Sequence, residues 1–208
     1  MPDRNPPVLG VLLAGGRSSR MGGGDKCLRK LAGKTLLARA IERTRPQVAT
    51  LVLSANGDPS RFAEYGLPVV GDPPGLARRP LVGVVAGMEW AAANRPDLSW
   101  VANFATDMPF FPTDLVARLF AGIEAKNADI AFARTADTWH WVFGLWPMRV
   151  EEILRRELAP KKSSARVPLR WVSVAFPPGP PPPFFNVNRP EDLGEAERLL
   201  ATHGEQPM

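Results

Sequence analysis

The feature that most constrains the fold is a continuous apolar run, residues 8–14, which is bounded by Pro7 and by Gly15-Gly16. Its positions do not alternate between apolar and polar side chains, a pattern that indicates a strand buried on both faces. Strands of this kind occur in parallel sheets whose two faces are covered by helices. The run therefore predicts the first strand of an α/β fold, with a tight glycine turn at its carboxyl end.

Strand and helix patterns then alternate along the rest of the chain, which predicts a three-layer α/β/α sandwich around a mostly parallel, Rossmann-like sheet. We expect strands at 49–53, 67–70, 100–105, 129–133, 139–145 and 171–176, and helices at 34–45, 58–65, 81–93, 113–126, 150–158 and 191–200. Thr113 is placed to cap one of these helices with its side-chain oxygen. The proline run 177–183 predicts an exposed connector, because proline has no N–H to donate.

Composition is that of a globular protein, with 45% hydrophobic and 23% charged residues, and no boundary or repeat divides residues 1–208, so we expect a single domain. The single cysteine, Cys27, excludes an internal disulfide and is expected to be a small packing residue. No apolar run reaches the ~20 residues of a membrane span, and residues 1–7 do not resemble a signal peptide. We expect a cytoplasmic protein that does not enter the membrane.

The formal charge of +5 is compatible with nucleic acid or with small anions such as triphosphates. The basic residues are scattered along the chain, which favours small anions. A nucleic-acid binder stays open as an alternative, and it would bind oligonucleotides with a steep salt dependence.

The glycine turn carries the clearest chemical signal. Half of residues 15–24 are glycine, and Arg17, Arg20 and Lys26 lie in or just after this stretch. Backbone without Cβ atoms can bring several N–H groups to phosphate oxygens, while the cations neutralise their charge. The P-loop and dinucleotide fingerprints do not fit, because Lys26 stands between Asp25 and Cys27 and the glycine spacing differs. The alternative is a flexible surface loop with no ligand.

Residues 13–26 resemble the signature of the molybdenum cofactor guanylyltransferases, within the wider sugar-phosphate-type nucleotidyltransferases. Three later segments match in the same order: Pro80-Leu81-Val82-Gly83, Ala105-Thr106-Asp107-Met108-Pro109-Phe110, and residues 184–193. Together the matches cover nearly the whole chain. The resemblance implies a GT-A-like nucleotidyltransferase fold.

The resemblance also implies a set of site residues. Those expected to bind the nucleotide are Leu13, Ala14, Gly15, Gly16, Lys26, Ser54, Asn56, Asp72 and Asp107. Lys26, Arg20 and Asp107 would be catalytic, and Asp107 would hold Mg²⁺. The residues alone agree for Asp107, because it follows a predicted strand and ligands of open α/β sheets bind beyond the carboxyl ends of strands. A turn or helix-cap role before Pro109 is the alternative for Asp107.

The polar residues further along have alternatives of their own. Asn56 and Asp72 also suit turns, since they precede Gly57 and Pro73. Asn186 and Asn188 lie two apart on an extended segment, so both amides face one way. We expect them on the acceptor side, where they would bind phosphate, metal waters or pterin, or else satisfy backbone groups.

Two positions depart from the family pattern. Ser54 stands where members often carry Asn, and Arg79 stands where the loop before Pro80 usually has Gly. His140, which lies between Trp139 and Trp141 in a segment resembling one that flanks the acceptor, is assigned no catalytic role.

The function implied by the resemblance is transfer of GMP from GTP to the phosphate of molybdenum-bound molybdopterin, with release of pyrophosphate. Cytidylyl relatives tend to carry Ala-Ala-Gly where this chain has Ala14-Gly15-Gly16, which favours GTP. A relative that uses CTP or another acceptor, such as a cobamide precursor or a sugar phosphate, stays open. So does a non-catalytic nucleotide or pterin carrier. Implied partners are GTP, molybdopterin, molybdopterin-inserting proteins and molybdoenzyme chaperones, without nucleic acid.

Overall fold

The computed structural model describes residues 7–15, 23–76, 79–136, 138–160 and 169–204. Within these residues a seven-stranded sheet has the order β5-β4-β1-β6-β8-β7-β9. Its strands are β1 Val8–Leu13, β4 Thr50–Ser54, β5 Val69–Val70, β6 Trp100–Ala105, β7 Ile130–Thr135, β8 Thr138–Pro147 and β9 Trp171–Ala175. All neighbours pair in parallel except β8, which is antiparallel to both β6 and β7. The predicted mostly parallel sheet is confirmed.

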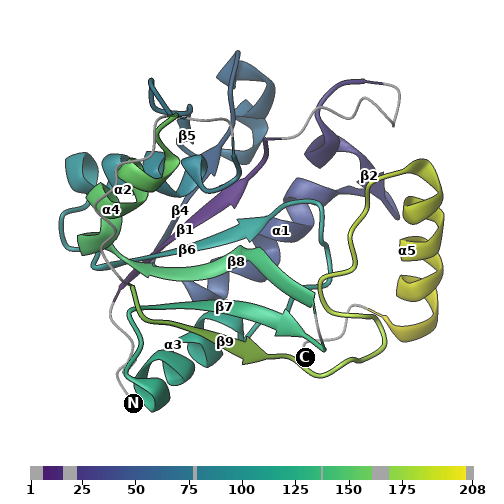
Figure 1. Cartoon of the computed structure of the whole chain (residues 1–208). Coiled ribbons are helices and arrows are strands. Elements are labelled where there is room, and N and C mark those ends of the chain that lie inside the picture. Colours follow the sequence, from purple (N-terminus) through teal and green to yellow (C-terminus); the bar gives the residue numbers. More distant parts are fainter. Residues whose placement is uncertain (1–6, 16–22, 77–78, 137, 161–168, 205–208) are drawn as a thin grey trace.

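Helices cover both faces of the sheet and give the three predicted layers (Figure 1). The helices α1 Leu36–Thr44 and α3 Leu115–Lys126 pack on one face, in a core that includes Leu37, Leu119 and Phe104. The helices α2 Val82–Asn94 and α4 Glu151–Leu158 pack on the other face. β1 supplies side chains to both cores, with Leu12 on one side and Val11 on the other, as the unbroken apolar run predicts.

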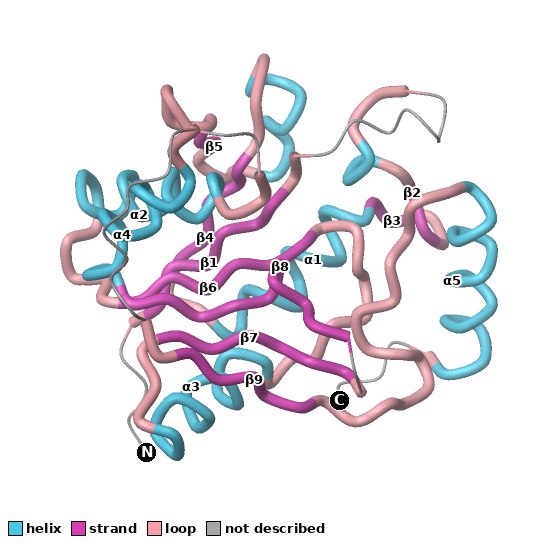
Figure 2. The backbone as a smooth tube through the Cα atoms, in the orientation of Figure 1, coloured by secondary structure: helices cyan, strands magenta, loops and turns pink. Residues whose placement is uncertain are grey.

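The last helix, α5 Pro190–His203, packs on a short hairpin and not on the main sheet (Figure 2). The hairpin consists of β2 Lys30–Leu31 and β3 Lys34–Thr35. A third apolar cluster includes Leu31 of the hairpin, Val187 just before α5, and Ala196 on α5. This packing returns residues 184–188 to the edge of the sheet where β1 and β6 end.

Short 3-10 turns complete the described elements: η2 Lys26–Leu28, η3 Arg45–Gln47, η4 Pro59–Tyr65 and η5 Met148–Val150. Some predicted boundaries were wrong. The helix expected at 34–45 begins at Leu36, because Lys34 and Thr35 pair in the hairpin and the Thr35 hydroxyl caps α1 by accepting from the Ala38 N–H at 3.1 Å. Thr113 is not the N-cap of α3, since that position belongs to Asp114.

The proline run lies in neither a helix nor a strand, as predicted, but it is not a wholly exposed connector. Pro181 and Pro183 are buried, and they lead into the buried side chain of Phe184. Apolar surface on alternate residues of the run is thereby removed from water, which the sequence pattern of prolines alone does not reveal.

Among the described helices, none is both long and apolar enough to cross a membrane.

Candidate active site

The candidate site lies where the direction of strand addition reverses. The chain leaves β1 and passes through α1 to β4 on one side, and it leaves β5 and passes through α2 to β6 on the other side of β1. The carboxyl ends of β1 and β6 are therefore neighbours at a topological switch point, the position where open α/β sheets bind ligands. Lys26 follows β1, and Asp107 follows β6.

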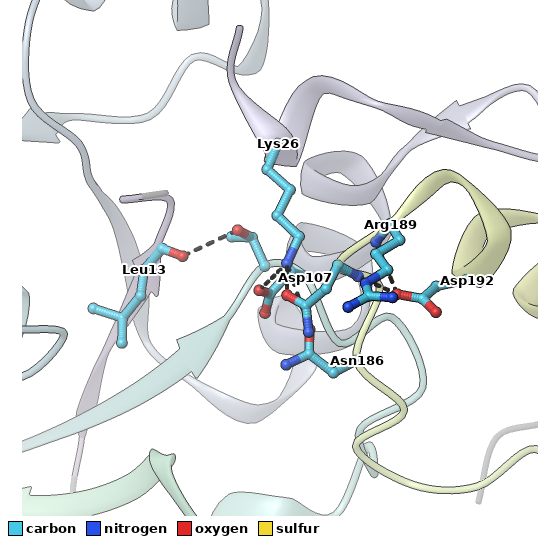
Figure 3. A network of polar contacts seen from close by, with 8 residues as sticks. Leu13, Lys26, Asp107, Asn186, Arg189 and Asp192 are labelled. Carbon is cyan, nitrogen blue, oxygen red and sulfur yellow. Dashed lines mark hydrogen bonds and ion pairs between the residues drawn. The ribbon is translucent and has the colours of Figure 1, made fainter. Parts of the chain in front are cut away.

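Lys26 is the centre of a polar cluster (Figure 3). Its Nζ lies 2.6 Å from Oδ2 of Asp107. The same ammonium donates to Oδ1 of Asn186 at 3.5 Å and to Oδ1 of Asn188. Only 12% of the Lys26 side chain and 28% of the Asp107 side chain are exposed, so the pair is partly shielded from water.

The asparagines reach Lys26 because their segment is fastened at two points. The Val187 N–H donates to the backbone oxygen of Asp107 at 2.9 Å, which places the segment along the end of β6. The N–H groups of Asn188 and Arg189 donate to the Asp192 carboxylate at 2.7 and 2.8 Å, at the start of α5. The prediction that both amides face one way is confirmed, since both amide oxygens accept from the same ammonium.

The end of β1 is tied to its two neighbouring strands. The Leu13 carbonyl accepts from the hydroxyl of Thr106 at 3.0 Å, and the Ala14 N–H donates to the Ser54 carbonyl at 3.0 Å. The Ala14 N–H is thus already committed, whereas Gly15 is exposed at the rim. Gly16 and Arg20, predicted to bind phosphate and to assist catalysis, lie outside the described residues.

Ser54 points beneath the first turn of α2 and is buried. A Cβ at Gly83 would lie 2.4 Å from the Ser54 hydroxyl oxygen and 2.7 Å from Cδ2 of Leu13. Only glycine at position 83 lets α2 approach the ends of β1 and β4 so closely. Gly83 ends the Pro80-Leu81-Val82-Gly83 motif, and this packing is the physical reason for a glycine there. The Ser54 contact with nucleotide stays a prediction.

Asn56 and Asp72 extend the site toward the β5 edge. The Asn56 amide nitrogen donates to Oδ2 of Asp72 at 2.7 Å, and the Asp72 backbone N–H donates to Oδ1 of Asn56 at 2.9 Å. Both residues are exposed. The two residues predicted to contact the nucleoside are therefore hydrogen-bonded to each other, and the Asn56 amide holds one oxygen of the Asp72 carboxylate.

Two side chains, those of Cys27 and His140, have shifted pKa values. Burial, reinforced by the neighbouring Asp25 carboxylate, raises the pKa of the Cys27 thiol to about 12, which agrees with the predicted packing role. Burial lowers the pKa of His140. The His140 ring stacks on Phe184 with 4.5 Å between ring centroids, and its Nε2 lies 2.7 Å from the Thr135 hydroxyl.

Comparison with known proteins identifies the family. A family model described as the MobA-like NTP transferase domain matches residues 10–173. A molybdenum cofactor guanylyltransferase of Rhodopseudomonas palustris (strain BisB5) is 49% identical, with 94% of this chain and 95% of that protein covered. The corresponding protein of Bradyrhizobium sp. (strain ORS 278) is 50% identical, with 93% of each covered.

A solved structure agrees at the level of the fold. The crystal structure of molybdopterin-guanine dinucleotide biosynthesis protein A from Archaeoglobus fulgidus superposes with a TM-score of 0.68 at 20% identity, and covers 94% of this chain and 99% of that one. The nucleotidyltransferase fold that the resemblance implied is thereby confirmed. On the family model and the curated relatives, the chain belongs to the MobA-like nucleotidyltransferases, in the molybdenum cofactor guanylyltransferase family.

Proposed function

We propose that this protein transfers GMP from GTP to the terminal phosphate of molybdenum-bound molybdopterin and releases pyrophosphate. The curated relatives carry the name molybdenum cofactor guanylyltransferase. The observation that carries the proposal for this chain is the contact of Lys26 with Asp107 at the switch point of the sheet. A phosphate-binding cation and an acid suited to a metal are both within reach of one nucleotide there.

The polar groups lie in an order that suits the two substrates. Asn56 and Asp72 follow β4 and β5, whereas Lys26 and Asp107 follow β1 and β6. The 184–188 segment is hydrogen-bonded to the backbone of Asp107. A GTP molecule would place its base toward Asp72 and its triphosphate beside Lys26. The acceptor phosphate would then approach from the side of Asn186 and Asn188.

The Asp72 carboxylate supports guanine as the base. Guanine presents its amino group as a donor beside a ring N–H, a pair of donors that one carboxylate can accept together. Cytosine presents its amino donor beside a ring acceptor, which a carboxylate would repel. The Asn56 amide holds one Asp72 oxygen at 2.7 Å and so fixes the orientation of the carboxylate before the base arrives.

The reaction needs no protein nucleophile or general base. The acceptor phosphate is already ionised near neutral pH, and one of its oxygens attacks the α-phosphorus in line while the bond to the departing pyrophosphate breaks. Lys26 contributes by placing a fixed positive charge where negative charge gathers, in surroundings from which water is partly excluded. The Asn186 and Asn188 oxygens hold the ammonium in place from the acceptor side.

The residues at the site fit Mg²⁺. The described residues contain no group of three or more His, Cys, Asp or Glu side chains that could enclose a metal, and Mg²⁺ does not require one. It keeps several waters and takes one or two carboxylates together with substrate phosphates. Asp107 would supply the carboxylate, and the bound ion would neutralise phosphate charge and polarise the α-phosphoryl group.

The experiment is a transfer assay with purified protein, molybdopterin, GTP and Mg²⁺, read by pyrophosphate release and by the mass of the product. We expect one pyrophosphate for each guanine dinucleotide formed, no turnover with CTP, and loss of turnover when a chelator removes the metal. Turnover with CTP alone would make the protein a cytidylyl enzyme. GTP binding without pyrophosphate release in the presence of acceptor would favour a carrier.

Two further expectations belong to the proposal and rest on the family resemblance. The reaction would take place in the cytoplasm, and its product would pass to molybdopterin-inserting proteins and molybdoenzyme chaperones. Co-purification of the product with such proteins from cells would test the second expectation.

A further inference from the structure

Arg61 joins two parts of the site that would touch different parts of the nucleotide. It lies in η4, shortly after Asn56, and one terminal guanidinium nitrogen donates to the Asn56 carbonyl oxygen. Its Nε lies 2.7 Å from Oδ2 of Asp25, the residue directly before Lys26. One side chain thus contacts the backbone at the nucleoside end and the turn that carries the phosphate-binding lysine.

The guanidinium is held in this position from its other sides. Its central carbon lies 4.8 Å from the ring centroid of Phe62, which is 1% exposed and therefore a fixed platform. Gly57 has a φ of +87°, and a Cβ there would come within 2.9 Å of a terminal nitrogen of Arg61. Because glycine has no Cβ, position 57 leaves room for the guanidinium of Arg61.

The Asp25 side chain, at the other end of the bridge, does not cap the turn that follows it. Asp25 is the N-cap of η2, but its carboxylate makes no capping hydrogen bond and instead pairs with Arg61. The Asp25 backbone oxygen accepts from the Leu28 N–H at 3.1 Å, which closes the turn that begins with Lys26. Fixing the Asp25 side chain consequently fixes the turn from which Lys26 reaches Asp107.

We propose that Arg61 is a positioning residue, which holds the Lys26 turn in register with the nucleoside-binding pair Asn56 and Asp72. The inference rests on the proposed function, because it assigns a base to one end of the bridge and phosphates to the other. Arg61 is not itself a phosphate ligand, since Asp25 and the Asn56 carbonyl occupy two of its faces and Phe62 a third.

The test is a double-mutant cycle with Arg61→Gln, Asp25→Asn and the double variant, measured by GTP-dependent pyrophosphate release. Each single change should lower kcat about tenfold and raise the KM for GTP a few-fold, and the double variant should match the single variants because both changes break one bridge. Arg61→Lys should recover part of kcat, because an ammonium can pair with Asp25 but cannot also reach the Asn56 carbonyl in the same geometry.

The matched controls are Arg95→Gln and Asp97→Asn. Arg95 and Asp97 form an exposed ion pair, with 2.7 Å between Nη2 and Oδ2, just after α2 and before β6 begins, at the opposite end of that strand from Asp107. Both control variants should keep wild-type kcat and KM. Melting temperatures of all variants should be recorded, because a bridge that merely stabilised the fold would lower the melting temperature while leaving kcat unchanged.

Three results would overturn the inference. One is unchanged kcat in Arg61→Gln, and another is full additivity in the double variant. The third is tighter GTP binding by Asp25→Asn, which would mean that a released Arg61 binds phosphate directly. If the wild-type protein transferred no nucleotide, the proposed function would fail. Calorimetric titration of GTP into the same variants would still test the positioning role of Arg61, which predicts equal and non-additive losses of GTP affinity.

Discussion

Replacement of Lys26 by alanine tests the centre of the site. The change removes an ammonium that contacts three side-chain oxygens, of Asp107, Asn186 and Asn188. In the substrate complex the same charge would face the triphosphate. A hydrogen bond to a charged group contributes about 1.5–3 kcal/mol, and removal of one preorganised charge-stabilising group lowers rates by about 10²–10³.

We therefore expect kcat/KM for GTP to fall at least about a hundredfold in Lys26→Ala, which corresponds to roughly 2.7 kcal/mol of lost transition-state stabilisation. The fold should survive, because the Asp107 carboxylate that loses its partner is 28% exposed and can be hydrated in place of the ammonium, at a cost of about 1–3 kcal/mol. The melting temperature should fall by no more than roughly 10 °C.

The assay is continuous pyrophosphate release at saturating molybdopterin and Mg²⁺, with far-ultraviolet circular dichroism to confirm the fold. Lys34→Ala is the matched control, because Lys34 also pairs with a carboxylate, that of Glu42 at 2.9 Å, but the pair is exposed. The control should behave as wild type. Turnover by Lys26→Ala within a few-fold of wild type would refute the assignment of Lys26 to the phosphates.

Three other predictions concern the base, the buried thiol of Cys27 and the half-buried imidazole of His140. Asp72→Asn should raise the KM for GTP and narrow the preference for GTP over CTP by about tenfold or more, whereas an unchanged ratio would mean that Asp72 does not contact the base. Burial raises the pKa of Cys27 to about 12, so a thiol reagent at pH 8 should label the protein only after denaturation. The unfolded chain loses the thiol proton first, so the free energy of unfolding should fall as pH rises above the ordinary thiol pKa of 9.0. Rapid labelling of the native protein would contradict this prediction. Burial lowers the pKa of His140 below its ordinary 6.5, so the unfolded chain takes up the proton first, and stability should decline as pH falls below that value. The free energy of unfolding, measured with urea at pH 5.5 and at pH 7.5, should differ less between the two pH values in His140→Gln than in the wild type. An equal difference in both proteins would mean that the imidazole is not the cause of the pH dependence.

The layered fold could be predicted because its causes are local in sequence. The unbroken apolar run at residues 8–14 requires cover on both faces, and the structure places Val11 and Leu12 in opposite cores. That the glycine turn and Asp107 lie close together followed from the same reasoning, since both were expected at carboxyl ends of strands in one sheet. The direct ion pair between Lys26 and Asp107 was not predicted.

Other features depend on contacts between distant segments, for which periodicity carries no signal. Asn186 and Asn188 were expected near the acceptor only by resemblance, and they reach Lys26 because α5 docks on the β2–β3 hairpin through the cluster around Leu31. The bridge from Arg61 to Asp25 had no sequence signature at all. Nor could the pattern show that Pro181 would be buried, because burial there depends on how the run meets the rest of the chain.

The most direct measurement is a crystal structure of the protein with a non-hydrolysable GTP analogue and Mn²⁺, in which the anomalous signal locates the metal. We expect phosphate oxygens within hydrogen-bond distance of Nζ of Lys26, the manganese on the Asp107 carboxylate, and the guanine beside Asp72. A nucleotide whose phosphates lie away from Lys26, or a metal bound without Asp107, would contradict the assignment of this cluster as the catalytic site.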